Sequence, residues 1–448
     1  MYLKKLKIKN WQCIKETYIE FENLMLFIGQ SNSGKTSIMA AIMYFLGFRN
    51  FRPRDIRNGS NFTILEGRFY NSKQKSYFID GKEYRDRNFW VKIVKDSNRK
   101  EQYFYRCSSP WREICEEEYN NIMKLTQVMY IPTISEKEET QYFVRCLLKN
   151  IDTSKIDESA SLNKVINIFK ELNSDYTSHG LYRNLIFEII CEIAYQSQKI
   201  GHSILKDTLL IFEEPELYLH PQREKELFSC LNTITKLGAQ IYVTTHSSNF
   251  VSLYKYRSIC IIRNNLQNGS RVFQYKGKLF YGDEIKNFNM NYWINPDRSE
   301  LFFAKKVILV EGQTDKIVLG YLAKKLGVYK YDYSIVECGS KSLIPQFIKL
   351  LNIFKIPYVA IYDKDNHYWR TQEELEHSNE RNKIIQRAIN PKIGYYIEFE
   401  NDIEEEIYTE KRERRNYKNK PFYALKTVSS EEYHISNSFK KKILRIFS

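Results

Sequence analysis

The 448-residue sequence predicts an α/β protein with two successive α/β domains. Three apolar runs bounded by turn residues have the length of buried parallel strands, and each is followed by a polar or glycine-bearing turn and then by a helical pattern. These runs cover residues 24–29, 208–212 and 240–245. A second series begins at Lys305, with a strand at 307–310, a helix at 314–326 and a further strand at 358–362. In such domains the chemistry lies at the carboxyl ends of the strands.

The domain boundary is predicted near residues 295–299, where Asn, Pro and Asp cluster. We therefore expect a first domain at 1–298, with a helical insertion at about 111–175, and a second domain at 299–410. Residues 411–448 contain eleven Lys or Arg and three Glu. This basic tail either completes the second domain or is solvated and partly disordered.

Composition and charge indicate a cytoplasmic protein that binds nucleic acid. No stretch approaches the ~20 consecutive apolar residues that a membrane helix requires, so we expect no membrane association. The first ten residues alternate apolar and basic side chains, which predicts a strand at a sheet edge and not a signal peptide. The eight Cys are scattered and are expected to be reduced thiols. The net charge of +15 favours nucleic acid as a partner, because neutralised phosphates release counterions.

A phosphate-binding loop follows the first predicted strand. Residues 29–36 match G-x-x-x-x-G-K-[ST], and a helical pattern begins at Ser37. Glycines allow the loop amides to surround phosphates, Lys35 reaches the terminal phosphates, and Thr36 can bind Mg²⁺. The residues expected to bind ATP are Gly29, Asn32, Gly34, Lys35, Thr36 and Ser37.

The second predicted strand ends in the carboxylates of Glu213 and Glu214, and His246 follows the third strand. Carboxylates at this place can hold a magnesium-bound water and orient the water that attacks the γ-phosphate. The order matches ABC-type ATPases, and Glu-Glu-Pro-Glu followed by Leu-His-Pro resembles the ATPase half of the overcoming-lysogenisation-defect (OLD) family of nucleases. By this resemblance Glu213 binds the metal at the Walker B position, Glu214 is the catalytic carboxylate and His246 senses the γ-phosphate. Most ABC proteins carry Asp where this chain has Glu213.

The ABC signature loop, which contacts ATP bound to a second head, is assigned to the segment with Ser178 and Gly180. The match is degenerate, and a plain helix N-cap at Ser178 is the alternative. A true signature loop would require two heads around each ATP, which implies a homodimer or a higher homo-oligomer.

A second group of carboxylates belongs to the second domain. Glu311 ends a predicted strand, Asp315 lies in the first turn of the next helix, and Asp363 and Asp365 end a further strand. Alternation along an extended chain would send both Asp side chains to the same side. Oxygen ligands of this kind suit Mg²⁺, whereas the alternative is a set of surface caps after strands. E-G-x-x-D followed by D-x-D resembles the Toprim fold of type II topoisomerases, bacterial primases and OLD nucleases.

The resemblance to OLD nucleases implies two further groups. One is another metal-binding carboxylate in the acidic cluster at 400–406, with Glu404 as first choice and Glu400 as second; a solvated helix face is the alternative. The other is a lysine that stabilises charge on the phosphate in the transition state, for which Lys420 is the nearest match.

The resemblance therefore implies an ABC-type P-loop ATPase head followed by a Toprim, Rossmann-like domain. The expected activity is ATP hydrolysis together with cleavage of DNA, most readily double-stranded DNA, by an endonuclease that uses Mg²⁺ or Mn²⁺, in defence against phage. Two alternatives stay open, namely cleavage of RNA such as tRNA, or an ATP-driven sensor or clamp whose effector is a partner protein encoded nearby. The basic tail does not distinguish DNA from RNA.

Overall fold

The chain folds into two compact units, Met1–Gln274 and Tyr275–Ser448. The computed structural model describes residues 1–97, 101–108, 110–133, 179–203, 205, 207–251, 253–265, 267, 269–279, 296–408 and 419–448. The predicted helical insertion at about 111–175 is thus described only as far as residue 133, and a boundary between residues 298 and 299 stays a prediction.

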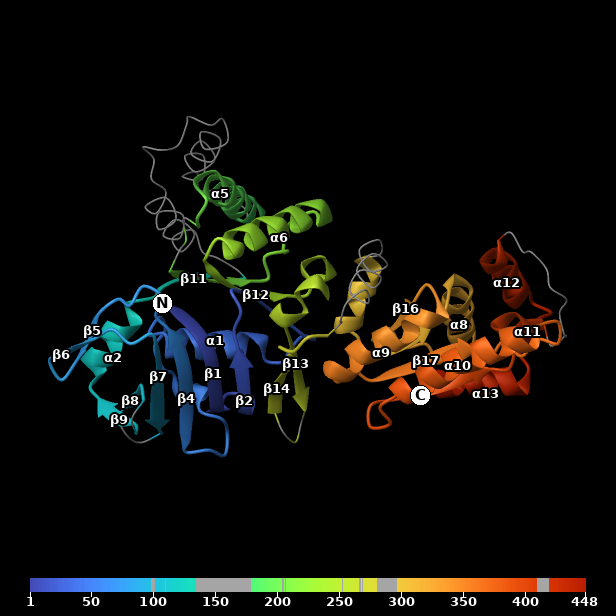
Figure 1. The fold of residues 1–448 in the computed structure, drawn as a ribbon, viewed down its shortest axis with the longest axis horizontal. Helices are drawn as coiled ribbons and strands as arrows, with labels where there is room; N and C mark the ends of the chain where they lie inside the picture. Colours follow the sequence, from blue (N-terminus) through green and yellow to red (C-terminus); the bar gives the residue numbers. More distant parts are fainter. Residues whose placement is uncertain are drawn as a thin grey trace. The chain divides into compact units, whose positions relative to one another are not determined.

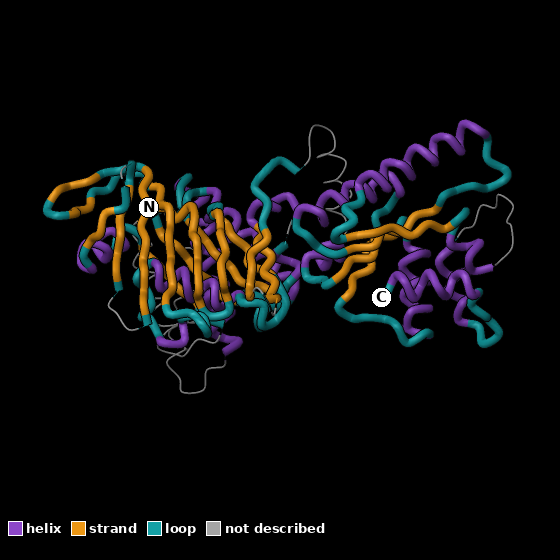
Figure 2. Tube along the Cα trace, turned by 90° about the horizontal axis from the view of Figure 1, so that it is seen from below, coloured by secondary structure: helices purple, strands orange, loops and turns teal. Residues whose placement is uncertain are grey.

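The first unit is built on one 12-stranded sheet in the order β10-β11-β12-β3-β13-β14-β2-β1-β4-β7-β8-β9. Its strands are β1 (Tyr2–Trp11), β2 (Ile14–Glu20), β3 (Leu24–Ile28), β4 (Phe62–Tyr70), β7 (Asn88–Asp96), β8 (Gln102–Arg106), β9 (Arg112–Ile114), β10 (Gln127–Ile131), β11 (Thr208–Glu213), β12 (Gln240–Thr245), β13 (Ile259–Asn265) and β14 (Gly269–Phe273). A separate hairpin consists of β5 (Tyr77–Ile79) and β6 (Lys82–Tyr84). The run from β10 to β13 is parallel and the remainder is antiparallel. Figure 2 shows the strands of this sheet running side by side.

The predicted strands of the first unit are confirmed. The prediction that the N-terminal strand lies at the edge of a sheet is wrong. Strand β1 pairs with β2 on one side and with β4 on the other, so it lies inside the sheet. Lys5, Lys7 and Lys9 alternate with the buried Leu6 and Ile8, so these lysines point away from the core face.

Helix α1 (Lys35–Phe45) forms the centre of the first unit. Nine of its eleven residues are buried, as expected for a helix whose sequence is apolar on nearly every side. Trp11 stacks on Tyr44 with ring centroids 5.3 Å apart, and Phe45 stacks on Phe69 at 5.8 Å. The large sheet therefore packs around α1 and fixes the loop that precedes it.

The other helical segments in the described part of this unit are η1 (Pro53–Asp55), α2 (Glu116–Met123), α5 (His179–Ile200), α6 (Pro221–Lys236), η3 (Ser248–Phe250) and η4 (Leu253–Ser258). Figure 1 shows α5 and α6 side by side next to β11 and β12. Because β3, β11 and β12 are parallel neighbours, the loops at their carboxyl ends meet at one edge of the sheet.

The second unit has a four-stranded parallel sheet in the order β16-β15-β17-β18, with helices on its faces. Its elements are η5 (Pro296–Phe302), β15 (Lys306–Val310), α8 (Gln313–Lys325), β16 (Tyr333–Glu337), η6 (Lys341–Leu343), α9 (Ile344–Ile353), β17 (Tyr358–Asp363), α10 (Gln372–Ala388), β18 (Gly394–Phe399), α11 (Ile403–Tyr408), α12 (Lys420–Ser429) and α13 (Asn437–Ile446). The predicted second series of strand, helix and strand corresponds to β15, α8 and β17.

The basic C-terminal segment belongs to the core of the second unit. Val428 of α12 and Phe439 of α13 are buried in one cluster with Leu322 of α8. Residues 419–448 therefore complete this unit and are not a solvated tail, while residues 411–418 lie outside the described part of the chain. Among the described residues, no helix combines the length and apolar character needed to cross a membrane.

Candidate nucleotide site and metal centre

The loop between β3 and α1 has the backbone of a phosphate cradle. Gly29 and Gly34 have φ angles of +155° and +104°, and Asn32 has φ +60°. A Cβ atom on Gly34 would lie 2.5 Å from the hydroxyl of Ser270, so no other residue fits there without displacement. These positions require the residues that the motif predicts.

Lys35 is the first residue of α1 and its ammonium group folds back over the loop. Its Nζ donates hydrogen bonds to the carbonyls of Gly29 at 2.9 Å and Gln30 at 3.1 Å. Burial lowers the pKa of Lys35, while the nearby Glu214 and Glu216 oppose that shift. An anion at the loop would restore the charged form, which suits a phosphate ligand.

The two residues after Lys35 differ in their surroundings. Thr36 is exposed beside the loop, and its binding of a metal ion stays a prediction. Ser37 lies 3.3 Å from the sulfur of Cys13 through its hydroxyl, and its carbonyl accepts a 2.9 Å hydrogen bond from the Trp11 indole. Trp11 is fully buried and packs in the core.

The end of β11 carries the predicted carboxylates. Glu213 is buried and accepts a 2.9 Å hydrogen bond from Tyr130, and burial raises its pKa. Glu214 has a left-handed backbone with φ +42°, and its carboxylate lies 3.6 Å from Nε2 of His246. Strand pairing thus brings together the three residues expected at the hydrolytic end of an ATP site.

Two further residues of this site were not assigned roles from the sequence. Arg183 of α5 donates to the carbonyls of Pro132 at 2.6 Å and Glu213 at 3.2 Å, so it ties α5 to the end of β11. Glu216 accepts a 2.6 Å hydrogen bond from the backbone N–H of His246, and burial raises its pKa. Glu216 is the last carboxylate of its motif, and Arg183 is the last residue of the segment assigned to the signature loop, but neither was given a role of its own.

The predicted signature loop is described only in part. Gly180 lies in the first turn of α5, where its carbonyl accepts a 3.0 Å hydrogen bond from Asn184. Ser178 lies outside the described residues. The signature function of this segment stays a prediction.

Three carboxylates gather at the ends of β15 and β17 in the second unit. Glu311 follows β15 and accepts a 2.9 Å hydrogen bond from the backbone N–H of Asp363. Asp315 accepts a 2.9 Å hydrogen bond from the N–H of Gly312 at the start of α8, and it is buried. The parallel pairing of β15 with β17 explains why residues about fifty positions apart meet here.

The electrostatics of these three carboxylates suit a divalent cation. Burial raises the pKa of Glu311 to about 7 and that of Asp315 to about 7. Burial also raises the pKa of Asp363, and the charges of Asp315 and Glu311 add to that shift. Hard oxygen donors crowded in this way are the chemistry that Mg²⁺ or Mn²⁺ accepts, so the residues fit the ion that the Toprim pattern implies.

Asp365 differs from Asp363 in its backbone and its partners. The strand ends at Asp363, and Asp365 has φ +63°, so the alternation of an extended chain no longer applies to it. One carboxylate oxygen lies 2.7 Å from Arg370 and the other lies 2.9 Å from Lys341 and 3.0 Å from Ser378. Asp365 therefore binds the basic side chains of Arg370 and Lys341 beside the centre. The sequence patterns had identified neither of these residues.

The two candidate ligands after β18 are placed differently. Glu400 is exposed and bonds to Lys364 and Asn366 at 3.0 Å each, and the hydrogen bond from Lys364 lowers its pKa. Glu404 is buried, and its charge contributes to the raised pKa of Asp315. This arrangement favours Glu404 over Glu400, in the order that we expected.

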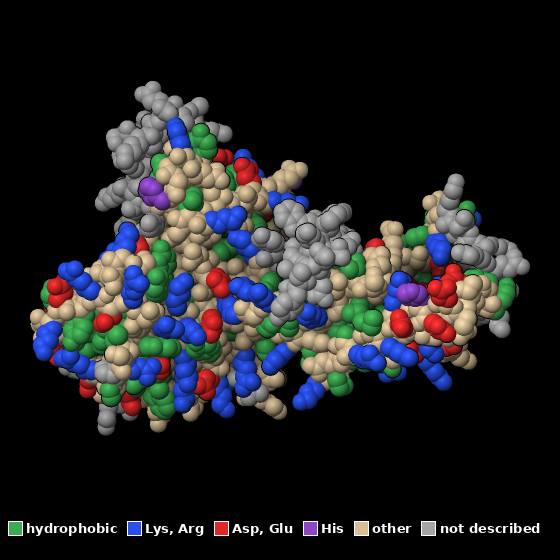
Figure 3. Space-filling view, in the orientation of Figure 1, with side chains coloured by type: hydrophobic (Ala, Val, Ile, Leu, Met, Phe, Trp, Pro, Cys, Tyr) green, Lys and Arg blue, Asp and Glu red, His purple; other side chains and the backbone are tan. Residues whose placement is uncertain are grey.

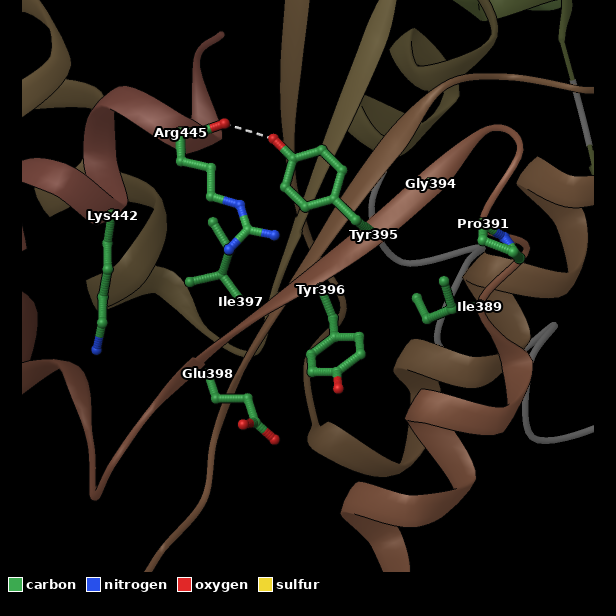
Figure 4. Close-up of a pocket in the computed structure, with 9 residues that line it drawn as sticks. All are labelled: Ile389, Pro391, Gly394, Tyr395, Tyr396, Ile397, Glu398, Lys442 and Arg445. Atoms are coloured by element: carbon green, nitrogen blue, oxygen red, sulfur yellow. Dashed lines mark hydrogen bonds between the residues drawn. The ribbon is translucent and has the colours of Figure 1, made fainter.

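A groove runs along β18 at the edge of the second sheet, with a cavity volume of about 480 Å³. Figure 4 shows Tyr395, Tyr396 and Glu398 of β18 on its wall, with Lys442 and Arg445 projecting from α13.

On the face seen in Figure 3, Lys and Arg side chains are spread over the first unit, and Asp and Glu side chains gather on the second.

Comparisons with known proteins match both units. The model of the AAA ATPase domain family matches residues 1–155 and 92–251, and the model named "Overcoming lysogenization defect protein-like, TOPRIM domain" matches residues 302–365. An OLD nuclease of Thermus scotoductus is 22% identical, covering 87% of this chain and 88% of its own. The Old nuclease of Escherichia phage P2 is 27% identical over 42% of this chain and 33% of its own. Endonuclease GajA of Bacillus cereus is 25% identical over 61% of this chain and 44% of its own.

Among solved structures, the SMC head domain from Thermotoga maritima is 13% identical, with a TM-score of 0.39, and covers 62% of this chain and 100% of its own. The SMC head bound to the C-terminal winged-helix domain of ScpA is 15% identical, with a TM-score of 0.42, and covers 62% of this chain and 98% of its own.

Proposed function

Since the chain belongs to the AAA ATPase domain family, carries an OLD-like Toprim domain after it and is similar to an OLD nuclease over most of its length, we propose that it is an ATP-hydrolysing, metal-dependent endonuclease. The observation that carries this proposal is the group formed by Glu311, Asp315 and Asp363. One buried and two partly buried carboxylates, gathered where β15 and β17 end and α8 begins, are costly unless a cation binds them.

The proposed nuclease centre uses Glu311, Asp315, Asp363 and Glu404 as ligands, with Asp365 as a further one. Bound divalent ions would supply Lewis-acid activation of water and stabilise the leaving oxygen. Lys341 and Arg370 each form an ion pair with the carboxylate of Asp365, and these two contacts fix the loop after β17. Lys420 would neutralise negative charge on the phosphate as the bond breaks.

The proposed ATP site uses the loop with Gly29, Asn32 and Gly34 for the phosphates, and Lys35 for the terminal ones. The hydroxyl of Thr36 and the carboxylate of Glu213 would hold Mg²⁺. Glu214 would orient the attacking water, and His246, whose Nε2 lies 3.6 Å from that carboxylate, would sense the γ-phosphate.

The substrate that we propose is double-stranded DNA, and the basic groove along β18 supports a nucleic-acid partner. Arg445, which lies 5.3 Å over the ring of Tyr395, would offer its charge to a phosphate backbone, whereas Lys442 is paired with Glu406. We further propose that the protein acts in the cytoplasm as a homodimer or higher homo-oligomer, in defence against phage.

A cleavage assay tests the proposal. Purified protein is incubated with supercoiled plasmid and, in parallel, with total RNA, in Mg²⁺ or Mn²⁺ and with or without ATP. We expect nicked or linear plasmid, lost in Glu311→Ala and retained in Glu380→Ala, which removes an exposed carboxylate on α10. Cleavage of RNA alone would redirect the proposal to an RNA substrate, and intact nucleic acid under every condition would overturn it. Loss of function in cells on Lys35→Ala but not on Asp363→Asn would instead indicate a clamp whose effector is a partner.

A further inference from the structure

Two cysteine side chains are in contact where helices α5 and α6 of the first unit pack together. The sulfur atoms of Cys191 and Cys230 lie 3.3 Å apart, although thirty-nine positions separate these residues in the chain. Both are free thiols in the structure. A disulfide bond is about 2.0 Å long, so the two sulfurs need to approach by about 1.3 Å to form one.

The packing of the two helices fixes this contact. Arg223 of α6 donates a 3.0 Å hydrogen bond to the side chain of Asn184 of α5 and lies 3.5 Å from a carboxylate oxygen of Glu188. Cys191 lies seven positions after Asn184, and Cys230 lies seven positions after Arg223, which is about two helical turns in each case. The helices therefore run side by side in one register, and this register holds the two sulfurs opposite each other.

The surroundings of the two thiols allow a small oxidant to react with them. Both side chains are half-buried, so a molecule as small as hydrogen peroxide can reach a sulfur. The hydrogen bond between the sulfurs lowers the pKa of Cys230, against the effect of burial, and it raises the pKa of Cys191. Because the thiolate is the nucleophilic form of cysteine, this asymmetry favours Cys230 as the group that reacts first.

We propose that Cys191 and Cys230 form a reversible disulfide when the protein is exposed to hydrogen peroxide, and that this bond slows ATP hydrolysis. The Cys230 thiolate attacks one peroxide oxygen, the O–O bond breaks, and the hydroxide that leaves takes up a proton to become water. The sulfur of Cys191 then attacks the resulting sulfenic acid, and the S–O bond breaks as the S–S bond forms. The hydroxyl group leaves with the Cys191 proton as a second water. Two thiols are thus oxidised and one peroxide is reduced, and a dithiol reductant reverses the bond.

The expected effect on ATP hydrolysis rests on the proposed function and on the residues that the two helices carry. Arg183 of α5 donates a 3.2 Å hydrogen bond to the carbonyl of Glu213. Glu224 of α6 accepts a 3.1 Å hydrogen bond from the side chain of Asn249, three positions after His246. A covalent bond between the helices therefore restrains groups on two sides of the ATP site. A displacement of 1 Å at a catalytic site can cost roughly 100-fold in rate, and we expect hydrolysis to become about 10-fold slower.

Peptide mapping of the full chain tests the disulfide independently of ATP. The protein is treated with hydrogen peroxide, free thiols are blocked, and the single-chain band of a non-reducing gel is digested with trypsin. We expect the peptide 184–199, with Cys191, to be linked to the peptide 226–236, with Cys230, and to separate from it after treatment with dithiothreitol. Cys191→Ser and Cys230→Ser should each abolish the link, whereas Cys115→Ser, which changes an exposed thiol, should leave it intact. Absence of the link from the wild type would overturn the proposal.

Phosphate release from ATP measures the regulatory effect on the same samples. After peroxide, hydrolysis should fall about 10-fold in the wild type and in Cys115→Ser, and it should recover with dithiothreitol. Cys191→Ser and Cys230→Ser should hydrolyse ATP at the wild-type rate before and after peroxide, which also shows that both variants are folded. A linked chain with an unchanged rate, or an equal loss of rate in these two variants, would overturn the regulatory role. If the reduced wild type hydrolysed no ATP, the proposed ATPase activity would fail, while the peptide map would still decide whether the disulfide forms.

Discussion

The ammonium nitrogen of Lys420 lies 3.3 Å from a carboxylate oxygen of Glu404. Lys420 is the first residue of α12 and Glu404 the second of α11, so the starts of two helices meet beside the carboxylate centre. The Lys420 side chain is 48% exposed, whereas that of Glu404 is 10% exposed. The lysine can therefore reach a bound phosphate, while the glutamate faces inward.

This placement predicts that Lys420→Met slows cleavage about 10²–10³-fold, as the loss of one group that stabilises transition-state charge does. Single-turnover cleavage of plasmid at saturating metal ion measures the rate. The concentration of Mg²⁺ needed for half-maximal rate should change little. Lys426→Met removes an exposed lysine from the same helix and should cleave normally. Equal rates for the two variants would show that Lys420 has no role in the reaction.

The crowded carboxylates predict a pH-dependent stability of the metal-free protein. Glu311 and Asp315 have pKa values of about 7 in the fold, against ordinary values of 4.5 and 3.8. Between these values the folded chain holds protons that the unfolded chain releases. The free energy of unfolding is therefore highest below about pH 4 as far as these groups are concerned, and falls as pH rises through about 7.

Thermal melting from about pH 4 to about pH 8, which spans that window, measures the effect. In chelator the melting temperature of the second unit should fall with pH, and Mg²⁺ should remove most of the fall. Glu311→Gln should flatten the profile, while Glu380→Gln should follow the wild type. A profile in chelator that Mg²⁺ does not change would refute this account of the centre.

The contact between Glu214 and His246 predicts a separation of ATP binding from hydrolysis. Glu214→Gln keeps the shape and the phosphate loop but removes the charge that orients water, so hydrolysis should fall about 10²–10³-fold with ATP affinity nearly unchanged. Glu213→Gln should instead raise the Mg²⁺ concentration that hydrolysis requires. Calorimetric ATP binding and phosphate release measure the two effects. Loss of ATP binding in Glu214→Gln would contradict the assignment.

Lys341 predicts a stability effect that is separate from catalysis. Its buried ammonium contacts Asp365 at 2.9 Å, Ser378 at 3.1 Å and the carbonyl of Asp363. Lys341→Met leaves these groups without their cation and should lower the free energy of unfolding of the second unit by about 3–5 kcal/mol. Urea unfolding measures it, with the exposed Lys316→Met as control. A difference under about 1 kcal/mol would show that Arg370 alone suffices for Asp365.

The sequence predicted those parts of the fold that depend on local pattern. The strands that precede Gly29, Glu214 and Glu311 are continuous apolar runs, and their bounds agree with the structure to within a residue or two. Parallel neighbouring strands have their carboxyl ends on the same side of a sheet. Within each unit, the residues that follow these strands therefore come together as expected. The left-handed backbone at Gly34 follows from the motif itself, since only glycine tolerates that position.

What the sequence did not predict depends on contacts between distant segments. The alternating pattern of β1 is the same in an edge strand and in an inner strand, and only its pairing with β4 decides between them. Nothing in the sequence distinguishes Lys341 and Arg370 from other basic residues. Their contacts with Asp365 depend on the left-handed backbone of that residue. His367 meets Glu405 across thirty-eight positions, and no spacing rule connects the two. The basic composition of the C-terminal segment also gave no indication that its two helices each have an apolar face.

The position of β18 has a consequence for solubility. It is the last strand of its sheet, and among the described residues no further strand pairs with its outer edge. Unpaired edges of this kind can recruit strands from other molecules and start aggregation. Lys442 and Arg445 line the groove beside this edge, and every copy of the chain carries the same positive charges there. Because Lys442 is paired with Glu406 and Glu398 lines the same groove, Arg445 is the charge there that we expect to disfavour edge-to-edge approach of two copies.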